Sequence, residues 1–184
     1  SRIIARSSEP VLPGSSFLWH GGPDGGSCFE TDDGYIYVSN AELMGGGGAS
    51  AIRFDISGRI VDAYPILENT NRNCAGGAMP YGTWLSCEES GDFGRVFECD
   101  PTGKTSAIER PALGYFNHEG AAYHKGSHTI YLTEDRNDGG FYRFTPSRLR
   151  DDGYAELSDG TLEVAQVTDQ HMRDGVIWHP INDP

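Results

Sequence analysis

Three acidic residues recur at a fixed interval along the chain. The step is 46 residues from Glu42 to Glu88 and again from Glu88 to Glu134, and each residue ends a short strand-like segment. Further candidate ligands lie 14 or 15 residues upstream of these three, at Cys28, Cys74 and Glu119. Carboxylate oxygens suit hard cations such as Ca²⁺, whereas a thiolate suits a softer metal such as iron or zinc. The spacing therefore indicates a mixed metal site, provided that the fold brings the repeats together.

The residues between these positions predict β-strands. Short runs of β-branched and aromatic residues, bordered by Gly, Asp, Asn or Pro, recur at 35–38, 83–85, 129–132 and 141–144. The chain holds 25 glycines and 10 prolines, which indicates many turns and few helices. The best candidate for a helical turn is 147–152. A period in the forties that is built from several short strands is typical of a β-propeller blade.

The expected architecture is an all-β propeller of four-stranded antiparallel blades, with the acidic-ended strands as candidates for the innermost positions. The repeats cover about 28–73, 74–118 and 119–167, and a further blade begins at 175–184. Because a propeller closes with about four to eight blades, these three to four blades form part of a larger propeller or a half that pairs with another chain. The alternative is two packed antiparallel sheets whose internal similarity is accidental.

The charge of the chain limits its partners. It has 27 acidic and 14 basic residues, a formal net charge of −13. Nucleic acids and anionic membranes need a positive contact surface, so we expect cations as partners instead. No apolar run approaches the roughly 18 residues of a membrane span. Four cysteines in 184 residues are too few for a disulfide scaffold, although a single bridge stays open.

Each candidate ligand also has a structural interpretation. We prefer to interpret Cys28 and Cys87 as small buried hydrophobic residues. Cys74 lies in an open Gly- and Ala-rich segment, where burial and metal ligation both stay open. The carboxylates could be solvated strand ends, although their regular spacing favours ion binding. The six histidines share no spacing, and we assign them to the surface or to the core.

Five segments resemble the PhoX-type alkaline phosphatase family. They are Asn73–Gly77 (NCAGG), Gly82–Glu89 (GTWLSCEE), His118–Ala121 (HEGA), Tyr131–Arg136 (YLTEDR) and Phe141–Phe144 (FYRF). The resemblance extends over about 3–184. It implies a six-bladed propeller with iron and calcium ions in its channel, phosphate monoesters as substrates, and export in the folded state to the periplasm or beyond.

The resemblance also implies roles for individual residues. By position, Cys74 resembles the iron-ligating cysteine, and Glu89 resembles the acidic residue of the Cys-Glu-Glu motif at the metal cluster. Glu119 and Asp135 resemble further carboxylate ligands. One segment departs from the family, because Met79–Tyr81 replaces Thr-Pro-Trp. The family's remaining ligands and phosphate-binding arginines lie in later blades, so this chain alone is expected to lack activity.

Two functions follow as hypotheses. The first is a metal-dependent phosphomonoesterase, whose bound cations let a phosphate dianion approach a channel lined by carboxylates. In this hypothesis Arg136 either assists the phosphate or pairs with Glu134 or Asp135. The second is a non-catalytic, calcium-bound propeller module that binds a partner, or assembles with copies of itself through unpaired strand edges.

Overall fold

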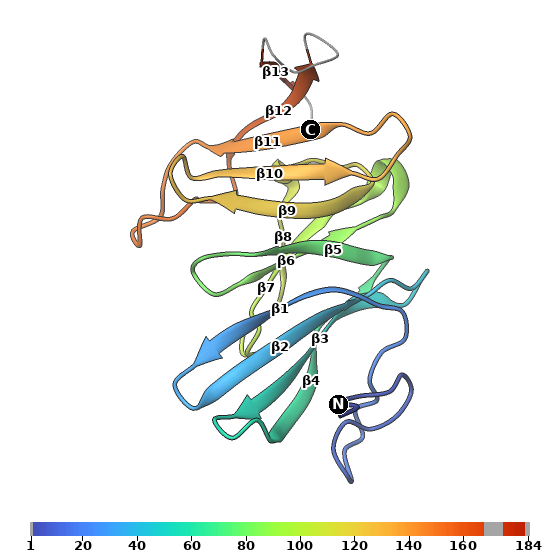
Figure 1. Cartoon of the computed structure of the whole chain (residues 1–184). Helices are drawn as coiled ribbons and strands as arrows, with labels where there is room; N and C mark the ends of the chain where they lie inside the picture. The colour runs from blue at the N-terminus through green and yellow to red at the C-terminus, as the bar shows by residue number, and fades with distance from the viewer. Residues whose placement is uncertain (1, 168–174, 183–184) are drawn as a thin grey trace.

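The protein is all-β, with three antiparallel sheets stacked along the chain (Figure 1). The computed structural model describes residues 2–167 and 175–182. The first sheet has the order β1-β2-β3-β4, with β1 (Pro23–Thr31), β2 (Gly34–Ala41), β3 (Gly47–Asp55) and β4 (Ile60–Thr70). The second has the order β5-β6-β7-β8, with β5 (Asn73–Ala78), β6 (Trp84–Glu88), β7 (Val96–Cys99) and β8 (Ile108–Glu109).

The third sheet has five strands in the order β13-β12-β11-β10-β9. They are β9 (His118–His124), β10 (Thr129–Glu134), β11 (Phe141–Pro146), β12 (Gly160–Val167) and β13 (Val176–Pro180). The start of a further repeat was expected at 175–184, of which 183–184 lie outside the described residues. The described part of that segment contains β13, which pairs with β12 and extends the third sheet.

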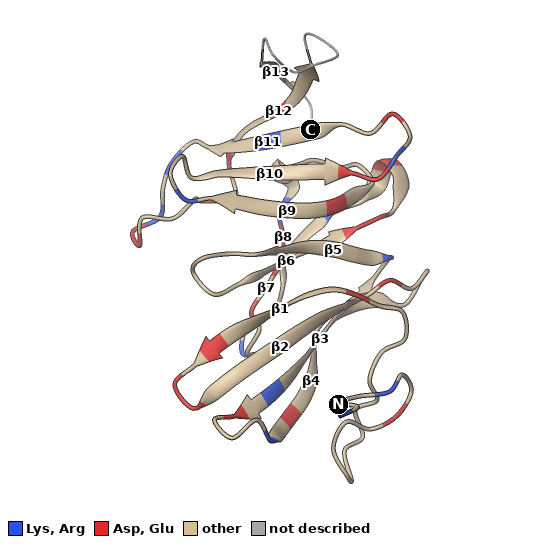
Figure 2. Ribbon diagram, viewed as in Figure 1, with Lys and Arg blue, Asp and Glu red and all other residues tan. Residues whose placement is uncertain are grey.

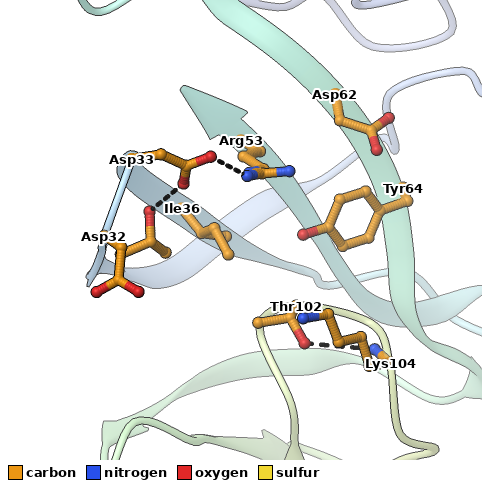
Figure 3. Close-up of a pocket in the computed structure, with 9 residues that line it drawn as sticks. Asp32, Asp33, Ile36, Arg53, Asp62, Tyr64, Thr102 and Lys104 are labelled. Carbon is orange, nitrogen blue, oxygen red and sulfur yellow. Dashed lines mark hydrogen bonds and ion pairs between the residues drawn. The ribbon is translucent and has the colours of Figure 1, made fainter. Parts of the chain in front are cut away.

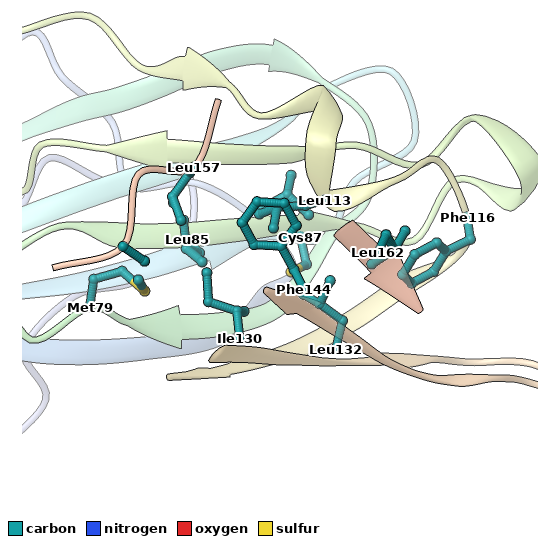
Figure 4. Packing of buried hydrophobic residues seen from close by; sticks show 12 residues of the cluster. Met79, Leu85, Cys87, Leu113, Phe116, Ile130, Leu132, Phe144, Leu157 and Leu162 are labelled. Carbon is teal, nitrogen blue, oxygen red and sulfur yellow. The ribbon is translucent and has the colours of Figure 1, made fainter. Parts of the chain in front are cut away.

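Apolar residues alternate along the strands and fill the spaces between the sheets. On β2, Ile36 and Val38 point to the second sheet and pack with Trp84. On β10, Ile130 and Leu132 point to the second sheet and pack with Leu85 (Figure 4). Because side chains alternate between the two faces of a strand, this period of two buries one face of each sheet against the next.

Asp-Gly turns connect the hairpins, as the sequence predicts. In the β3–β4 turn, Asp55 Oδ1 accepts a hydrogen bond of 2.9 Å from the Ser57 N–H, and Gly58 adopts φ 76°. In the β7–β8 turn, Asp100 Oδ1 accepts one of 2.8 Å from the Thr102 N–H. The side-chain acceptor fixes the turn, and the positive φ favours glycine at its end.

Helices are few, as expected, and the described residues contain only two short 3₁₀ turns, η1 (Gly91–Phe93) and η2 (Pro111–Leu113). The helical turn expected at 147–152 is wrong. Leu149 forms an isolated bridge with Ala155, and the Arg150 N–H donates to the Tyr154 carbonyl at 2.8 Å. The Asp-Asp-Gly sequence makes a tight turn there, and six residues are too few to stabilise a helix. No described helix has the length and apolar character needed to cross a membrane.

The acidic-ended strands do not hold the innermost positions, and that expectation is wrong. They are β2, β6 and β10, the second strand of each sheet. The sheets meet instead at their first strands, because β5 packs against both β1 and β9. A repeat period identifies equivalent strands, but it does not tell which of them lies at the edge of a sheet.

Candidate metal centre

Glycine allows the three first strands to approach one another. A Cβ atom added to Gly25 on β1 would lie 2.6 Å from the Ala75 Cα atom on β5. A Cβ atom added to Gly77 on β5 would lie 2.0 Å from the Ala121 carbonyl oxygen on β9. Any larger residue at these positions would push the strands apart. The side chains of β1, β5 and β9 are thereby brought to a common centre.

The strand register identifies two sets of equivalent residues. Each first strand starts opposite the end of the second, in the pairs Pro23↔Ala41, Asn73↔Glu88 and His118↔Glu134. One residue further along the first strands lie Asp24, Cys74 and Glu119. One residue further along the second strands lie Glu42, Glu89 and Asp135. Figure 2 shows acidic positions on β9 and at the end of β10 on the same side of the stack.

Five of these six residues form the ligand cluster, and they fall into two overlapping groups. In one group, ligand atoms of Asp24, Glu42 and Cys74 all lie within 4.8 Å of one another. In the other, ligand atoms of Cys74, Glu89 and Glu119 do so. Cys74 belongs to both groups and is buried, with 8% of its surface exposed. A thiol at the centre of four carboxylates is a donor set for a soft cation next to a hard one.

The electrostatics of the ligand cluster favour a bound cation. Burial raises the pKa of the Cys74 thiol, and the neighbouring carboxylates of Glu119, Asp24 and Glu42 raise it further. Burial also raises the pKa of Glu119; Asp135, Asp24 and Glu89 add to this, whereas a hydrogen bond from Cys74 opposes it. The Cys74 thiol and the Glu119 carboxyl thus resist ionisation. A bound cation would reverse this penalty, so the residues present fit a metal.

Glu89 accepts hydrogen bonds from two side chains, one before the second sheet and one before the third. Arg72 donates to its Oε2 atom at 2.9 Å and to Glu42 Oε1 at 3.2 Å. The Asn117 amide donates to Glu89 Oε1 at 3.1 Å and to the Asp135 carbonyl at 2.8 Å. Glu89 is therefore oriented by groups from outside its own sheet. Asp135 itself is exposed and lies outside the two groups.

Glu88 and Glu134, the other two members of the 46-residue series, lie outside the ligand cluster. Glu88 is buried, with 1% of its surface exposed, and accepts hydrogen bonds from the Arg95 guanidinium at 2.9 and 3.2 Å. Glu134 Oε2 accepts from the Gly140 N–H at 2.9 Å and from the Tyr142 hydroxyl at 2.8 Å. Both carboxylates join the strand that carries them to the start of the following strand.

Exchanging one carboxyl for an amide should distinguish the structural role of Glu88 from the metal-binding role of Glu89. Glu88→Gln breaks a buried charge pair, and because Arg95 can still reach water we expect a loss of about 2–3 kcal/mol in the free energy of unfolding. Calcium affinity should stay near the wild-type value. Glu89→Gln should weaken calcium binding and change chelated stability far less. Urea unfolding in chelator and calcium titration measure the two effects, and the reverse pattern would show that the assignment is wrong.

Arg136 faces carboxylates in this structure. It donates to Asp92 Oδ1 at 2.5 Å and lies 3.6 Å from Glu134 Oε1. The sequence left two roles open for Arg136, assisting a phosphate or forming an ion pair. These contacts are ion pairs. Its side chain is 40% exposed.

Asp24 is the member of the ligand cluster that sequence reasoning missed, and Cys28 is the residue that the repeat alignment put in its place. Cys28 is exposed on β1, so its interpretation as a buried residue is wrong. Cys87 is buried as expected, and all four cysteines are free. Asp24 precedes Glu42 by 18 residues, whereas Cys74 precedes Glu89 by 15, so the longer first hairpin puts Asp24, and not Cys28, at the position equivalent to Cys74. The only sequence signal for Asp24 is its place between glycines and proline, which is typical of a turn.

His118, which precedes Glu119, is fully buried. Its Nε2 atom donates to the Gly114 carbonyl at 3.0 Å, its ring lies 3.6 Å from the Phe116 ring centre, and its Nδ1 atom has no hydrogen-bond partner. Burial lowers the pKa of His118 to about 4. The folded protein therefore holds this imidazole neutral.

Acid should destabilise the chelated protein through His118. The unfolded chain binds a proton near pH 6.5 that the folded chain binds only near pH 4, so stability falls as the pH drops across this window, by about 3 kcal/mol. His118→Gln should remove that part of the pH dependence, whereas exposed His124→Gln should keep it. Urea unfolding at pH 7, 5.5 and 4 provides the measurement. Equal slopes in both variants would contradict the assignment.

A separate cavity lies on the opposite end of the first strands. It measures about 740 Å³ and lies between the β1–β2 turn, β3, β4 and the β7–β8 turn (Figure 3). Arg53 pairs there with Asp33, and Tyr64 and Lys104 complete the wall. The lining includes no residue of the ligand cluster, so the described cavity and the candidate metal centre are distinct.

One comparison with known proteins gave a match. The family model described as alkaline phosphatase PhoX matches residues 90–184, slightly more than half of the chain. The matched part includes Glu119 and Asp135, whereas Cys74 and Glu89 precede it. No curated protein and no solved structure matches the chain.

Proposed function

Because the chain belongs to the PhoX family of alkaline phosphatases, we propose that, together with the later blades that the resemblance implies, it hydrolyses phosphate monoesters at a metal centre held by the ligand cluster. The observation that carries this proposal is the position of Cys74 between the carboxylates of Asp24 and Glu42 on one side and those of Glu89 and Glu119 on the other. Two overlapping sets of donors suit two neighbouring cations. We assign iron to the thiol and calcium to the carboxylates.

The charge of the site explains why cations are needed. A phosphate monoester is a dianion, and each carboxylate about 4 Å from it would repel each of its charges by about 4 kcal/mol at an effective dielectric near 20. Bound metals supply Lewis-acid stabilisation of the phosphoryl oxygens. The protein's own residues hold the ligands in place: Asn40 donates to the Cys74 carbonyl at 3.1 Å, and Asn117 orients Glu89.

We further propose that the three sheets are successive blades of a larger propeller, as the repeat spacing predicts. Support comes from their stacking and from the convergence of their first strands at the ligand cluster. In this proposal the repeats at about 28–73, 74–118 and 119–167 are one partial propeller domain. Asp135, at the sixth equivalent position, becomes a ligand on metal binding. From the family resemblance we also propose that the protein acts outside the cytoplasm.

Metal analysis combined with an activity assay tests the function. The purified full-length protein is expected to contain iron and calcium and to hydrolyse an aryl phosphate, and chelation should abolish turnover. Calcium alone without turnover would overturn the enzyme proposal and favour the calcium-bound binding module. A protein that binds neither metal would contradict both.

A further inference from the structure

Arg72 lies in the two-residue link between β4 and β5, where the first sheet connects to the second. Its N–H donates to the Leu43 carbonyl at 3.0 Å, and its carbonyl accepts from the Glu89 N–H at 2.9 Å. Its backbone has φ 48°, in the left-handed region that few arginines adopt. The backbone is thus fixed between Glu89 and the residue after Glu42.

The side chain of Arg72 joins the two groups of the ligand cluster. It donates to Glu42 Oε1, which belongs with Asp24 and Cys74, and to Glu89 Oε2, which belongs with Cys74 and Glu119. Among the described residues it is the only basic side chain that an ion pair joins to this cluster. The guanidinium therefore neutralises part of the charge that a bound metal would neutralise.

From this geometry we infer that Arg72 is a built-in counter-ion, which competes with calcium for the carboxylates of the metal centre. The inference rests on the metal site of the proposed function. In the metal-free protein the guanidinium offsets the repulsion between Glu42 and Glu89. A bound cation turns this attraction into a repulsion between two positive centres, and the Arg72 side chain, 37% exposed, can then move toward water.

The inference predicts the direction in which calcium affinity changes when Arg72 is replaced. A group that stabilises the metal-free state more than the metal-bound state weakens metal binding. Removing the guanidinium should therefore tighten calcium binding and destabilise the chelated protein. An arginine that only oriented the carboxylates for the metal would have the opposite effect on affinity, because loss of an orienting partner weakens binding.

The test uses Arg72→Met in the full-length protein, with Arg143→Met as the matched control. Arg143 is also partly exposed and donates two hydrogen bonds to one carboxylate, Glu163, in the third sheet. Both substitutions remove one positive charge, so a general change in the attraction of calcium affects both equally. Calcium affinity is measured by calorimetric titration of chelator-stripped protein, and the melting temperature is measured in chelator and in excess calcium.

We expect Arg72→Met to tighten calcium binding by about threefold to tenfold relative to wild type and to Arg143→Met. Its melting temperature in chelator should fall by about 2–4 °C, and by less in calcium. Arg72→Lys, which keeps the charge, should stay near wild type. Equal or weaker calcium binding in Arg72→Met would overturn the inference, as would a wild-type protein that binds no calcium. Loss of phosphatase activity alone would bear on the proposed function and not on this comparison.

Discussion

Cys74→Ser is expected to remove iron from the protein and to lower phosphatase activity by at least about 100-fold. The hydroxyl that replaces the thiol has nearly the same size but is a poor ligand for a soft metal. Cys74 contributes to both donor groups, so no other residue of the ligand cluster can replace it. Loss of an outer-shell partner alone costs about 10–100-fold in metal affinity or activity, and loss of a ligand should cost more.

Cys28→Ser is the matched control, because Cys28 lies on the equivalent strand but is exposed and outside the ligand cluster. It should retain iron and activity. Elemental analysis after purification and hydrolysis of an aryl phosphate measure both variants. Equal iron loss in the two variants would show that Cys74 holds no special position, and full activity in Cys74→Ser would exclude it as a ligand.

The sequence predicted the strands and their grouping because both depend on local signals. β-Branched and aromatic runs with Gly and Asp at their borders mark strands and hairpins. The 46-residue step between Glu88 and Glu134 agrees with the structure, since both residues end the second strand of a sheet and connect it to the following one. The period thus reflects a recurring contact, in which a carboxylate at the end of the second strand accepts a hydrogen bond from the residue before the third strand.

The exact members of the metal centre could not be predicted from that period. Glu42 is equivalent to Glu89 by strand register, although the period aligns it with Glu88. A shift of one residue moves a side chain to the other face of a strand. Aligning Glu42 with Glu88 therefore equates a member of the ligand cluster with a buried structural carboxylate. Asp24 was missed because the first hairpin is longer: Asp24 precedes Glu42 by 18 residues, whereas Cys74 precedes Glu89 by 15, and a fixed period cannot follow this difference. The family resemblance pointed to Glu89, whose carboxylate lies in the ligand cluster.

Asn40→Ala is expected to lower the free energy of unfolding by about 3–5 kcal/mol. Asn40 is fully buried on β2, and its amide group satisfies four polar partners of the second sheet. Its Nδ2 atom donates to the carbonyls of Cys74 and Ala75 at 3.1 and 2.7 Å. Its Oδ1 atom accepts from Trp84 Nε1 and Ser86 Oγ, both at 2.9 Å. Each buried polar group left without a partner costs about 1–3 kcal/mol, and the four costs are not fully additive.

The same substitution links the core to the metal centre, because the lost hydrogen bonds fix the backbone of Cys74. Urea unfolding in chelator isolates the stability effect from any loss of metal, and Asn137→Ala, at an exposed loop position, is the control. That variant should stay within about 0.5 kcal/mol of wild type. Asn40→Asp should recover only part of the loss, since a carboxylate can accept from Trp84 and Ser86 but cannot donate to the two carbonyls. If Asn40→Ala matched Asn137→Ala in stability, the two sheets would not depend on this residue for their contact at Cys74.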